Sequence, residues 1–318
     1  MPMTPETLLA AGAETEQVAT GAVWAEGPVW LPERRAVRFS DIPGNRILEY
    51  SEATGGLAVY AADAEYPNGR VLDLDGAVIQ CSHGRRAVER DTGTADGAVP
   101  AVATLVDSYN GRRLNSPNDV VVKSDGTIWF TDPSYGIQKD TTEGREGREE
   151  YGDRYVFRFD PASGGLAPVV IDVEVPNGLA FSPDESILYV SDTSLGTPAM
   201  DGGPRLHGHA IHAYDVVDGR FARNGRIFAE VDPGVPDGFR VDLHGNIWSS
   251  SGDGVQVFAP DGTELLRIPV PETVSNVCFG GADGRTLYMT ATTSLYRIRT
   301  RVTDAAAALR SGAERARR

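Results

Sequence analysis

One short unit recurs six times along the chain: a polar residue, a short apolar strand, a turn and a second apolar strand. The copy NDVVVKSDGTIWFTD begins at Asn118, and NGLAFSPDESILYVSD begins at Asn177. The full set of copies begins at Glu26, Asn68, Asn118, Asn177, Asp237 and Asn276. Further strand-like segments follow the copies, so the period fits four strands per unit. The pattern predicts an all-β fold, a six-bladed β-propeller with four-stranded blades, whose closure protects sheet edges and leaves a central channel.

The repeats run through most of the chain, so we expect a single propeller domain over residues 1–318. A β-sandwich with an additional domain is the alternative, but it would not explain copies in register. Residues 1–20 are expected to form an N-terminal segment and residues 301–318 a C-terminal surface helix or tail. Two polar, Gly-rich insertions, residues 136–154 and 194–209, interrupt the period. They are expected to form a lid or rim over the channel mouth, with solvated surface insertions as the alternative.

Composition excludes several classes of partner. The formal net charge of −15 would repel a phosphate backbone, which argues against nucleic acid and for a small ligand. Cys81 and Cys278 are the only cysteines, so neither a disulfide framework nor a cysteine metal site is expected. The N-terminus lacks the basic region of a secretory signal, and no apolar run is long enough to span a bilayer. We therefore expect a cytoplasmic protein with no membrane partner, as a monomer or a simple homo-oligomer.

The residues that begin the copies have a shared position in a propeller. Each precedes the innermost strand of its blade, so together they form a ring around the channel mouth. Glu26 and Asp237 balance the charge of one divalent cation, and the Asn carbonyls complete an oxygen shell of the kind Ca²⁺ prefers. The alternative for each residue is ordinary turn chemistry, since Asn and Asp before a strand bond to nearby backbone. The joint pattern favours a cation, because acids and amides facing one axis would otherwise be poorly compensated.

The chain resembles the SMP-30/gluconolactonase family of six-bladed propellers, and most closely its bacterial gluconolactonase branch. The resemblance rests on AEGPVW, NSPNDVVVKSDGTIWFTDPSYG, VPNGLAFSPDESILYVSD, VPDGFRVDLHGNIW and CSHGRRAVERD, and it runs from about Trp24 to Arg299. It implies a divalent-cation-dependent hydrolase of sugar lactones. The metal ligands that it implies are Glu26, Asn177 and Asp237, with Asn118 added in several branches. Ca²⁺ is the first expectation, and Mg²⁺, Mn²⁺, Zn²⁺ and Fe²⁺ are the alternatives.

The resemblance also implies a mechanism for lactone hydrolysis. The lactone carbonyl would be polarised by the cation, and water would be the nucleophile, because no Ser–His or Cys–His pairing is apparent. The proton of that water would pass to Asp237 or to Asp119, and we favour Asp237 as ligand and base in one. Asx-turn chemistry is the alternative for Asp119, and a satisfied turn histidine for His83. The expected substrate-binding residues are Asn68, His83, Asn118 and Tyr135, whereas Asn276 is expected to be a turn residue.

Three functions follow from these expectations. The first is a lactonase, a carboxylic ester hydrolase that converts an aldonolactone to its aldonic acid. The second is a hydrolase of another lactone, ester or phosphotriester at the same site, where pocket shape would decide the substrate. The third is a non-catalytic propeller that binds a partner through its loops. Acids on the channel axis argue against a scaffold, so the favoured partner is a small-molecule lactone.

Overall fold

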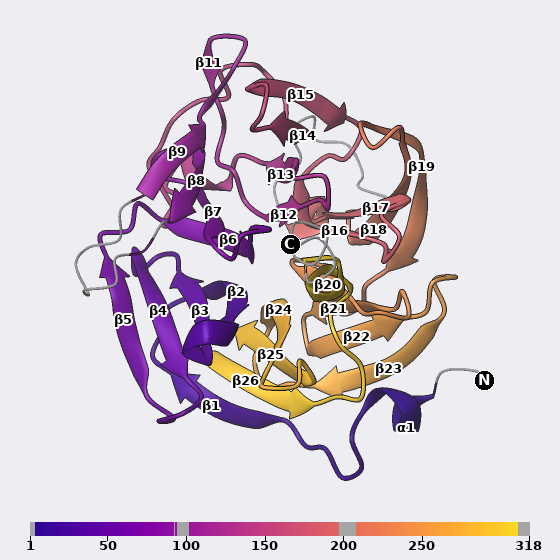
Figure 1. Cartoon of the computed structure of the whole chain (residues 1–318). Coiled ribbons are helices and arrows are strands. Elements are labelled where there is room, and N and C mark those ends of the chain that lie inside the picture. Colours follow the sequence, from indigo (N-terminus) through magenta and orange to yellow (C-terminus); the bar gives the residue numbers. More distant parts are fainter. Residues whose placement is uncertain (1–3, 92, 94–101, 197–207, 311–318) are drawn as a thin grey trace.

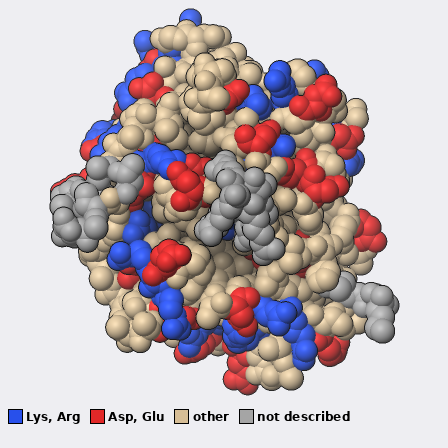
Figure 2. Space-filling model, viewed as in Figure 1, with Lys and Arg blue, Asp and Glu red and all other residues tan. Residues whose placement is uncertain are grey.

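The computed structural model describes residues 4–91, 93, 102–196 and 208–310, which form a ring of six four-stranded antiparallel sheets (Figure 1). The six-bladed propeller expected from the repeats is therefore confirmed. Both cysteines are buried and free. Within the described part of the chain, no helix has the length and apolar character needed to cross a membrane. Acidic and basic side chains are interspersed over the face seen in Figure 2.

The blades follow one another in chain order, each from its innermost strand outward. Blade 1 contains β2 (Ala25–Leu31), β3 (Ala36–Asp41), β4 (Arg46–Ser51) and β5 (Leu57–Ala62). Blade 2 contains β6 (Pro67–Leu72), β7 (Val78–Ser82), β8 (Ala87–Asp91) and β9 (Val102–Val106). Blade 3 contains β12 (Val120–Val122), β13 (Ile128–Asp132), β14 (Tyr155–Asp160) and β15 (Gly165–Val170).

The second half of the ring repeats this arrangement. Blade 4 contains β16 (Pro176–Phe181), β17 (Ile187–Asp192), β18 (Ala210–Val217) and β19 (Phe221–Glu230). Blade 5 contains β20 (Phe239–Val241), β21 (Ile247–Ser251), β22 (Gly254–Phe258) and β23 (Glu264–Pro269). Blade 6 contains β24 (Val274–Gly280), β25 (Thr286–Ala291), β26 (Ser294–Arg299) and β1 (Glu16–Thr20). The remaining elements are α1 (Pro5–Leu8), the hairpin β10 (Ser108–Tyr109) and β11 (Arg112–Arg113), and 3₁₀ turns at Pro32–Arg34, Tyr135–Ile137 and Ser194–Gly196.

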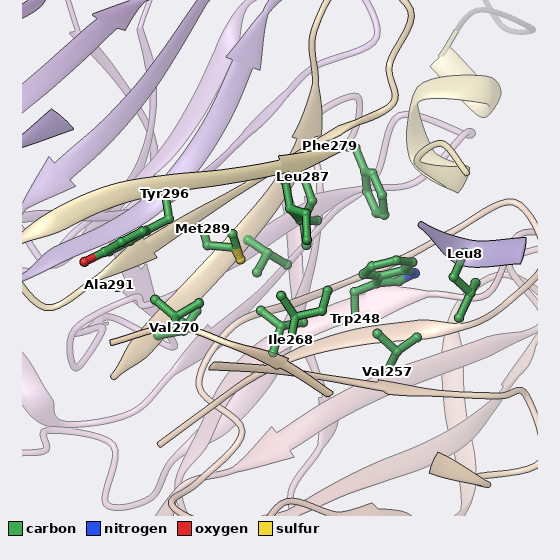
Figure 3. Close-up of a cluster of buried hydrophobic side chains, with 14 of the residues drawn as sticks. Leu8, Trp248, Val257, Ile268, Val270, Phe279, Leu287, Met289, Ala291 and Tyr296 are labelled. Carbon is green, nitrogen blue, oxygen red and sulfur yellow. The ribbon is translucent and has the colours of Figure 1, made fainter. Parts of the chain in front are cut away.

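Blade 6 is closed by the N-terminal segment. Strand β1 pairs antiparallel with β26, with Glu16 opposite Arg297 and Thr20 opposite Ser294. Leu8 of α1 is fully buried and packs in a core cluster with Trp248, Phe279 and other side chains of blades 5 and 6 (Figure 3). The two ends of the repeat region are thereby joined in one sheet, which removes the edge that β26 would otherwise expose.

The inner strands approach each other closely near the channel mouth, and this explains the glycine that follows several ring residues. A Cβ on Gly27, whose φ is +57°, would lie 2.4 Å from the carbonyl oxygen of Asn68. A Cβ on Gly178 would lie 2.3 Å from the carbonyl oxygen of Asp237, to which the Gly178 N–H donates a 3.0 Å hydrogen bond. Neighbouring blades are therefore joined backbone to backbone at the ring, where only glycine fits.

The described part of the C-terminal segment lies at the opposite end of the channel. Residues 305–310 form helical turns near the centre of the ring in Figure 1. They border a cavity with Val121, Val122 and Arg240, which belong to inner strands beyond the ring residues. Ala305 is buried, so this part of the predicted surface helix packs against the blades. The rest of that predicted segment, residues 311–318, lies outside the described residues.

Candidate active site

A cavity of about 200 Å³ lies at the channel mouth, at the end where the inner strands begin. The structure brings five of the six ring residues to its wall and leaves Asn276 out. The side chains that line the cavity are those of Trp24, Glu26, Ile42, Asn68, Asn118, Tyr135, Glu143, Asn177, Thr193, Val235 and Asp237. Residues from five blades thus converge on one small space, as the ring model predicts.

Asn276 contributes through its neighbour. Its Nδ2 donates a 2.8 Å hydrogen bond to Glu26 Oε1, and its Oδ1 accepts one from the Val277 N–H at 2.8 Å. Both ends of the amide are hydrogen-bonded, so Asn276 positions Glu26 from outside the cavity wall. This arrangement agrees with its omission from the expected ligands, and it adds a contact that turn chemistry alone did not predict.

Several buried oxygen atoms in the wall have no hydrogen-bond donor. They are Glu26 Oε2, Asn68 Oδ1, Asn118 Oδ1 and Asn177 Oδ1, on residues that are at most 5% exposed, and those of Glu26, Asn118 and Asn177 belong to expected metal ligands. A buried acceptor without a donor is costly, and a cation would satisfy the oxygens of Glu26, Asn118 and Asn177 at once. With the half-buried carboxylate of Asp237 they form an all-oxygen donor set suited to a hard divalent cation. No group of three His, Cys, Asp or Glu among the described residues forms a metal site, so the fit depends on the amides.

The electrostatics of the two acids agree with this fit. Burial raises the pKa of Glu26 to about 7; the hydrogen bond from Asn276 opposes this rise, and the nearby Asp119 carboxylate adds to it. Burial also raises the pKa of Asp237 well above its usual range, and repulsion from Glu26 adds to the effect. Two adjacent carboxylates in a poorly solvated site are costly to ionise together. A divalent cation between them would relieve that cost.

Asp119, the second candidate base, lies outside the cavity wall. Its Oδ1 accepts a 2.9 Å hydrogen bond from the Val120 N–H, and its Oδ2 lies 3.6 Å from Nη1 of Arg240. The side chain is fully buried, and burial raises its pKa. This bond to the next residue is not the Asx turn considered as its alternative, which would bond the N–H two residues on. Its charge acts on Glu26 and Asp237 from a short distance.

His83 also lies outside the wall, but it fixes a residue that lines it. Its Nδ1 is 2.9 Å from the carbonyl oxygen of Glu143, and its Nε2 is 3.0 Å from Nδ2 of Asn68. A carbonyl only accepts, so the proton is assigned to Nδ1, and Nε2 accepts from the Asn68 amide. Asn68 Oδ1 is then the end of the amide left without a partner. Burial lowers the pKa of His83 to about 4, which keeps the ring neutral near pH 7.

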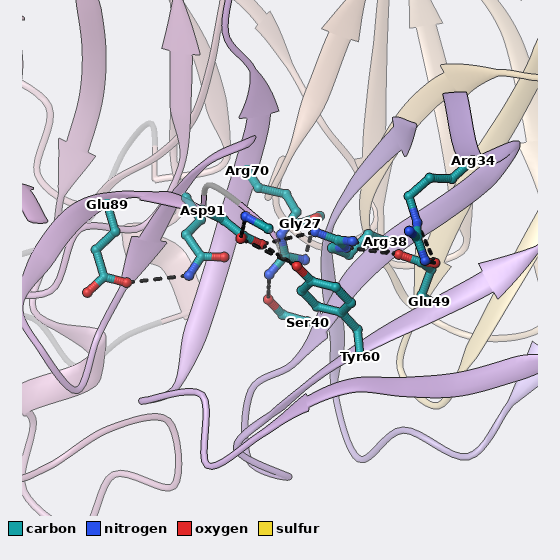
Figure 4. Close-up of polar contacts among 11 residues, drawn as sticks. Gly27, Arg34, Arg38, Ser40, Glu49, Tyr60, Arg70, Glu89 and Asp91 are labelled. Carbon is teal, nitrogen blue, oxygen red and sulfur yellow. Dashed lines mark hydrogen bonds and ion pairs between the residues drawn. The ribbon is translucent and has the colours of Figure 1, made fainter. Parts of the chain in front are cut away.

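A buried arginine holds the junction between blades 1 and 2 beside these residues (Figure 4). Arg70 Nη1 donates a 3.0 Å hydrogen bond to the Gly27 carbonyl, and Nη2 donates one at 2.8 Å to Ser40 Oγ. Ser40 Oγ in turn donates to the Asn68 carbonyl at 2.9 Å. Burial lowers the pKa of Arg70 to about 9, so it stays cationic at neutral pH. This network fixes the backbone next to Glu26 and at Asn68.

The first insertion and the residues just before both insertions contribute to the cavity wall. Tyr135 precedes the first insertion, and its hydroxyl is 2.6 Å from Oγ1 of Thr193, which precedes the second. Glu143 lies within the first insertion and also lines the cavity. The first insertion therefore borders the cavity at Glu143, and its role as a lid or rim stays a prediction. In the second insertion, residues 197–207 lie outside the described residues.

Sequence reasoning missed several wall residues. Glu143 and Thr193 lie in or beside insertions without periodicity, and only the expected rim pointed to that region. Trp24, Ile42 and Val235 supply apolar wall, although the apolar pattern alone assigns such side chains to the packed interior. Their closeness in sequence to Glu26 and Asp237 was the one available signal for Trp24 and Val235.

Comparison with known proteins places this geometry in a family. A gluconolactonase of Zymomonas mobilis is 30% identical over 314 residues, 93% of this chain and 84% of the relative. A pentonolactonase of Haloferax volcanii is 32% identical over 281 residues, which cover 87% of this chain and 84% of the relative. The solved structure of a Xanthomonas campestris gluconolactonase is 39% identical in sequence and superposes with a TM-score of 0.81. The match covers 92% of this chain and 91% of that one. The model of the SMP-30/gluconolactonase/LRE-like region matches residues 24–293. The chain therefore belongs to the SMP-30/gluconolactonase/LRE-like family.

Proposed function

We propose that this protein is a divalent-cation-dependent lactonase that hydrolyses a sugar lactone to its aldonic acid. The observation that carries the proposal is the set of unpartnered buried oxygens of Glu26, Asn118 and Asn177, which line one cavity together with Asp237. The similarity to gluconolactonases of Zymomonas mobilis and Xanthomonas campestris and to a pentonolactonase supports the substrate class. Two free cysteines suit a reducing compartment, which supports the expected cytoplasmic location.

Each part of the cavity has a role in this reaction. Glu26, Asn118, Asn177 and Asp237 would hold the cation, with Ca²⁺ as the first choice for an all-oxygen set. When bound, the cation supplies Lewis-acid polarisation of the lactone carbonyl. Asp237 takes a proton from the attacking water as the water oxygen bonds to the carbonyl carbon. The ring C–O bond then breaks, and the ring oxygen leaves as a hydroxyl by taking up the proton that Asp237 received from the water.

The same wall favours Asp237 over Asp119 as the base, because Asp237 lines the cavity and Asp119 does not. Asn68 presents Oδ1 to accept a substrate hydroxyl, and Tyr135 offers a phenol at the rim. The volume of about 200 Å³ is below the ~300–1,000 Å³ of pockets for drug-sized ligands. A compact monosaccharide lactone suits this space better than a bulky ester or phosphotriester.

The test is hydrolysis of an aldonolactone panel. Hydrolysis is measured by the protons released as each aldonic acid forms. The protein is stripped with EDTA and reloaded in turn with Ca²⁺, Mg²⁺, Mn²⁺, Zn²⁺ and Fe²⁺. We expect turnover only in the loaded forms, and a loss of at least about a hundredfold in Asp237→Asn, the usual scale for a general base. Asp261→Asn, in an exposed turn of the same blade, is the matched control and is expected to keep full activity.

Two results would contradict the proposal. If the metal-free protein were as active as the loaded forms, the role of the cation would be wrong. If no aldonolactone were hydrolysed under any condition, while aryl esters or phosphotriesters were, the second candidate function would replace the first.

A further inference from the structure

The cavity wall carries more negative charge than the proposed lactonase mechanism requires. Three carboxylates line the cavity, those of Glu26, Glu143 and Asp237, and the lining residues include no Lys, Arg or His within the described chain. The charge of a dication offsets Glu26 and Asp237. The carboxylate of Glu143 is then the uncompensated charge that a substrate meets.

Glu143 is held in place by its main chain. Its carbonyl accepts the hydrogen bond from His83 Nδ1, and its N–H donates to Thr141 Oγ1 at 3.1 Å. Two residues later, the Arg145 N–H donates a 2.9 Å hydrogen bond to the Gly136 carbonyl. Between them, Gly144 packs so closely on Gly136 that a Cβ would lie 2.1 Å from the Gly136 oxygen. The insertion is therefore a built element at this point, and the Glu143 side chain has a defined origin on the rim.

The basic residue nearest in sequence does not neutralise Glu143. Arg145 forms an ion pair with Glu65 instead, in the loop between β5 and β6. Desolvation is the only cause that shifts the pKa of Glu143, upward, so none of the described cations lies close enough to favour its charge. A carboxylate in this setting accepts hydrogen bonds from hydroxyl groups and repels an anionic substituent.

We propose that Glu143 makes the site selective for uncharged polyhydroxy lactones and excludes lactones that carry a carboxylate, phosphate or sulfonate group. The inference rests on the proposed lactonase function and names its substrate class. His83 supports this selectivity from outside the wall, since its Nδ1 holds the main chain of Glu143. Its Nε2 binds the amide nitrogen of Asn68, which leaves the Asn68 side-chain oxygen as a second acceptor for substrate hydroxyls. Specificity here comes from repulsion of the wrong substrate as well as from binding of the right one.

The test compares kcat/KM for glucono-1,5-lactone and for its 6-phosphate in the cation-loaded protein. We expect wild type to prefer the uncharged lactone by at least about tenfold, the effect of one unscreened like charge in a partly desolvated site. Glu143→Gln keeps an acceptor and removes the charge, so its preference should narrow by about tenfold, mainly through a lower KM for the phosphate. Glu146→Gln removes an equal charge from an exposed position on the same insertion and should keep the wild-type preference.

Equal kcat/KM values for the two lactones in wild type would overturn the inference, as would an unchanged preference in Glu143→Gln. If the protein hydrolysed neither these two lactones nor any other aldonolactone of the panel, the proposed function would fail, and the charge selection would be tested by binding. Calorimetric titration with gluconolactam and with its 6-phosphate then decides. The inference is supported if wild type binds the neutral lactam more tightly than its 6-phosphate and this difference in affinity is smaller in Glu143→Gln but unchanged in Glu146→Gln. Equal affinity of wild type for the two lactams contradicts it.

Discussion

At the scale of single residues, the site depends on which atom of each amide faces the cavity. His83 determines this for Asn68, because a proton on Nδ1 leaves Nε2 to accept from the amide nitrogen. Asn276 is fixed in the opposite sense, since its nitrogen donates to Glu26 and its oxygen accepts from the backbone. Two asparagines at equivalent repeat positions therefore have different roles, one lining the cavity and one supporting a proposed ligand.

The burial of neutral His83 predicts a pH dependence of stability. Its folded pKa of about 4 lies below the unfolded value of 6.5, so its contribution is complete above pH 6.5 and is lost as the pH falls towards 4. The loss amounts to about 3 kcal/mol over that window. His83→Gln keeps a donor for Glu143 and an acceptor for Asn68 but does not titrate. Urea unfolding should show the stability of wild type falling towards that of His83→Gln across this range, and a constant difference would contradict the assignment.

The ring residues could be predicted from the sequence because each has a fixed place before an inner strand. Glu26, Asn118, Asn177 and Asp237 all line the cavity for that reason. Glu143 could not be found this way, because an aperiodic insertion gives no register from which to place a side chain. The displacement of Asp119 from the wall also escaped prediction, since adjacent residues at a turn point in different directions and the sequence does not show which one faces the axis.

At the scale of the elements, the inner strands are irregular where they carry the ring. Register shifts follow Glu26 in β2 and precede Asn276 in β24, and similar shifts span the start of β6 and of β16. A bulge re-aims a side chain without disturbing the rest of the sheet. The repeated unit predicted the blades correctly, but it could not predict these bulges, which depend on contacts between neighbouring inner strands.

The N-terminal segment acts as part of blade 6. The sequence of β1, EQVAT, lacks the strong alternation of apolar and polar residues that predicts a strand. Its strand conformation therefore depends on pairing with the edge of β26. Leu8 is fully buried against blades 5 and 6, and Leu8→Ala should lower the free energy of unfolding by about 3 kcal/mol. Val23→Ala, at a site that is 58% exposed, is the control and should change little. Denaturant melts that coincide for wild type and Leu8→Ala would show that the segment does not stabilise the ring.

At the scale of the whole molecule, the propeller makes one site out of residues that lie up to 211 positions apart, from Glu26 to Asp237. Rigid blades joined backbone to backbone at the ring hold these oxygens together against their repulsion. Residues 305–310 border the far end of the channel, and Glu143 of the first insertion borders the mouth. This geometry suits a small substrate.

The most direct measurement is calorimetric titration of the EDTA-treated protein with Ca²⁺. Wild type should bind a single cation per chain, and Glu26→Gln should bind it at least about tenfold more weakly, since one charged oxygen ligand becomes neutral. Glu33→Gln, an exposed change in the same blade, should match wild type. Absence of binding by Ca²⁺ and by the other divalent metals, or binding that Glu26→Gln leaves unchanged, would contradict the account.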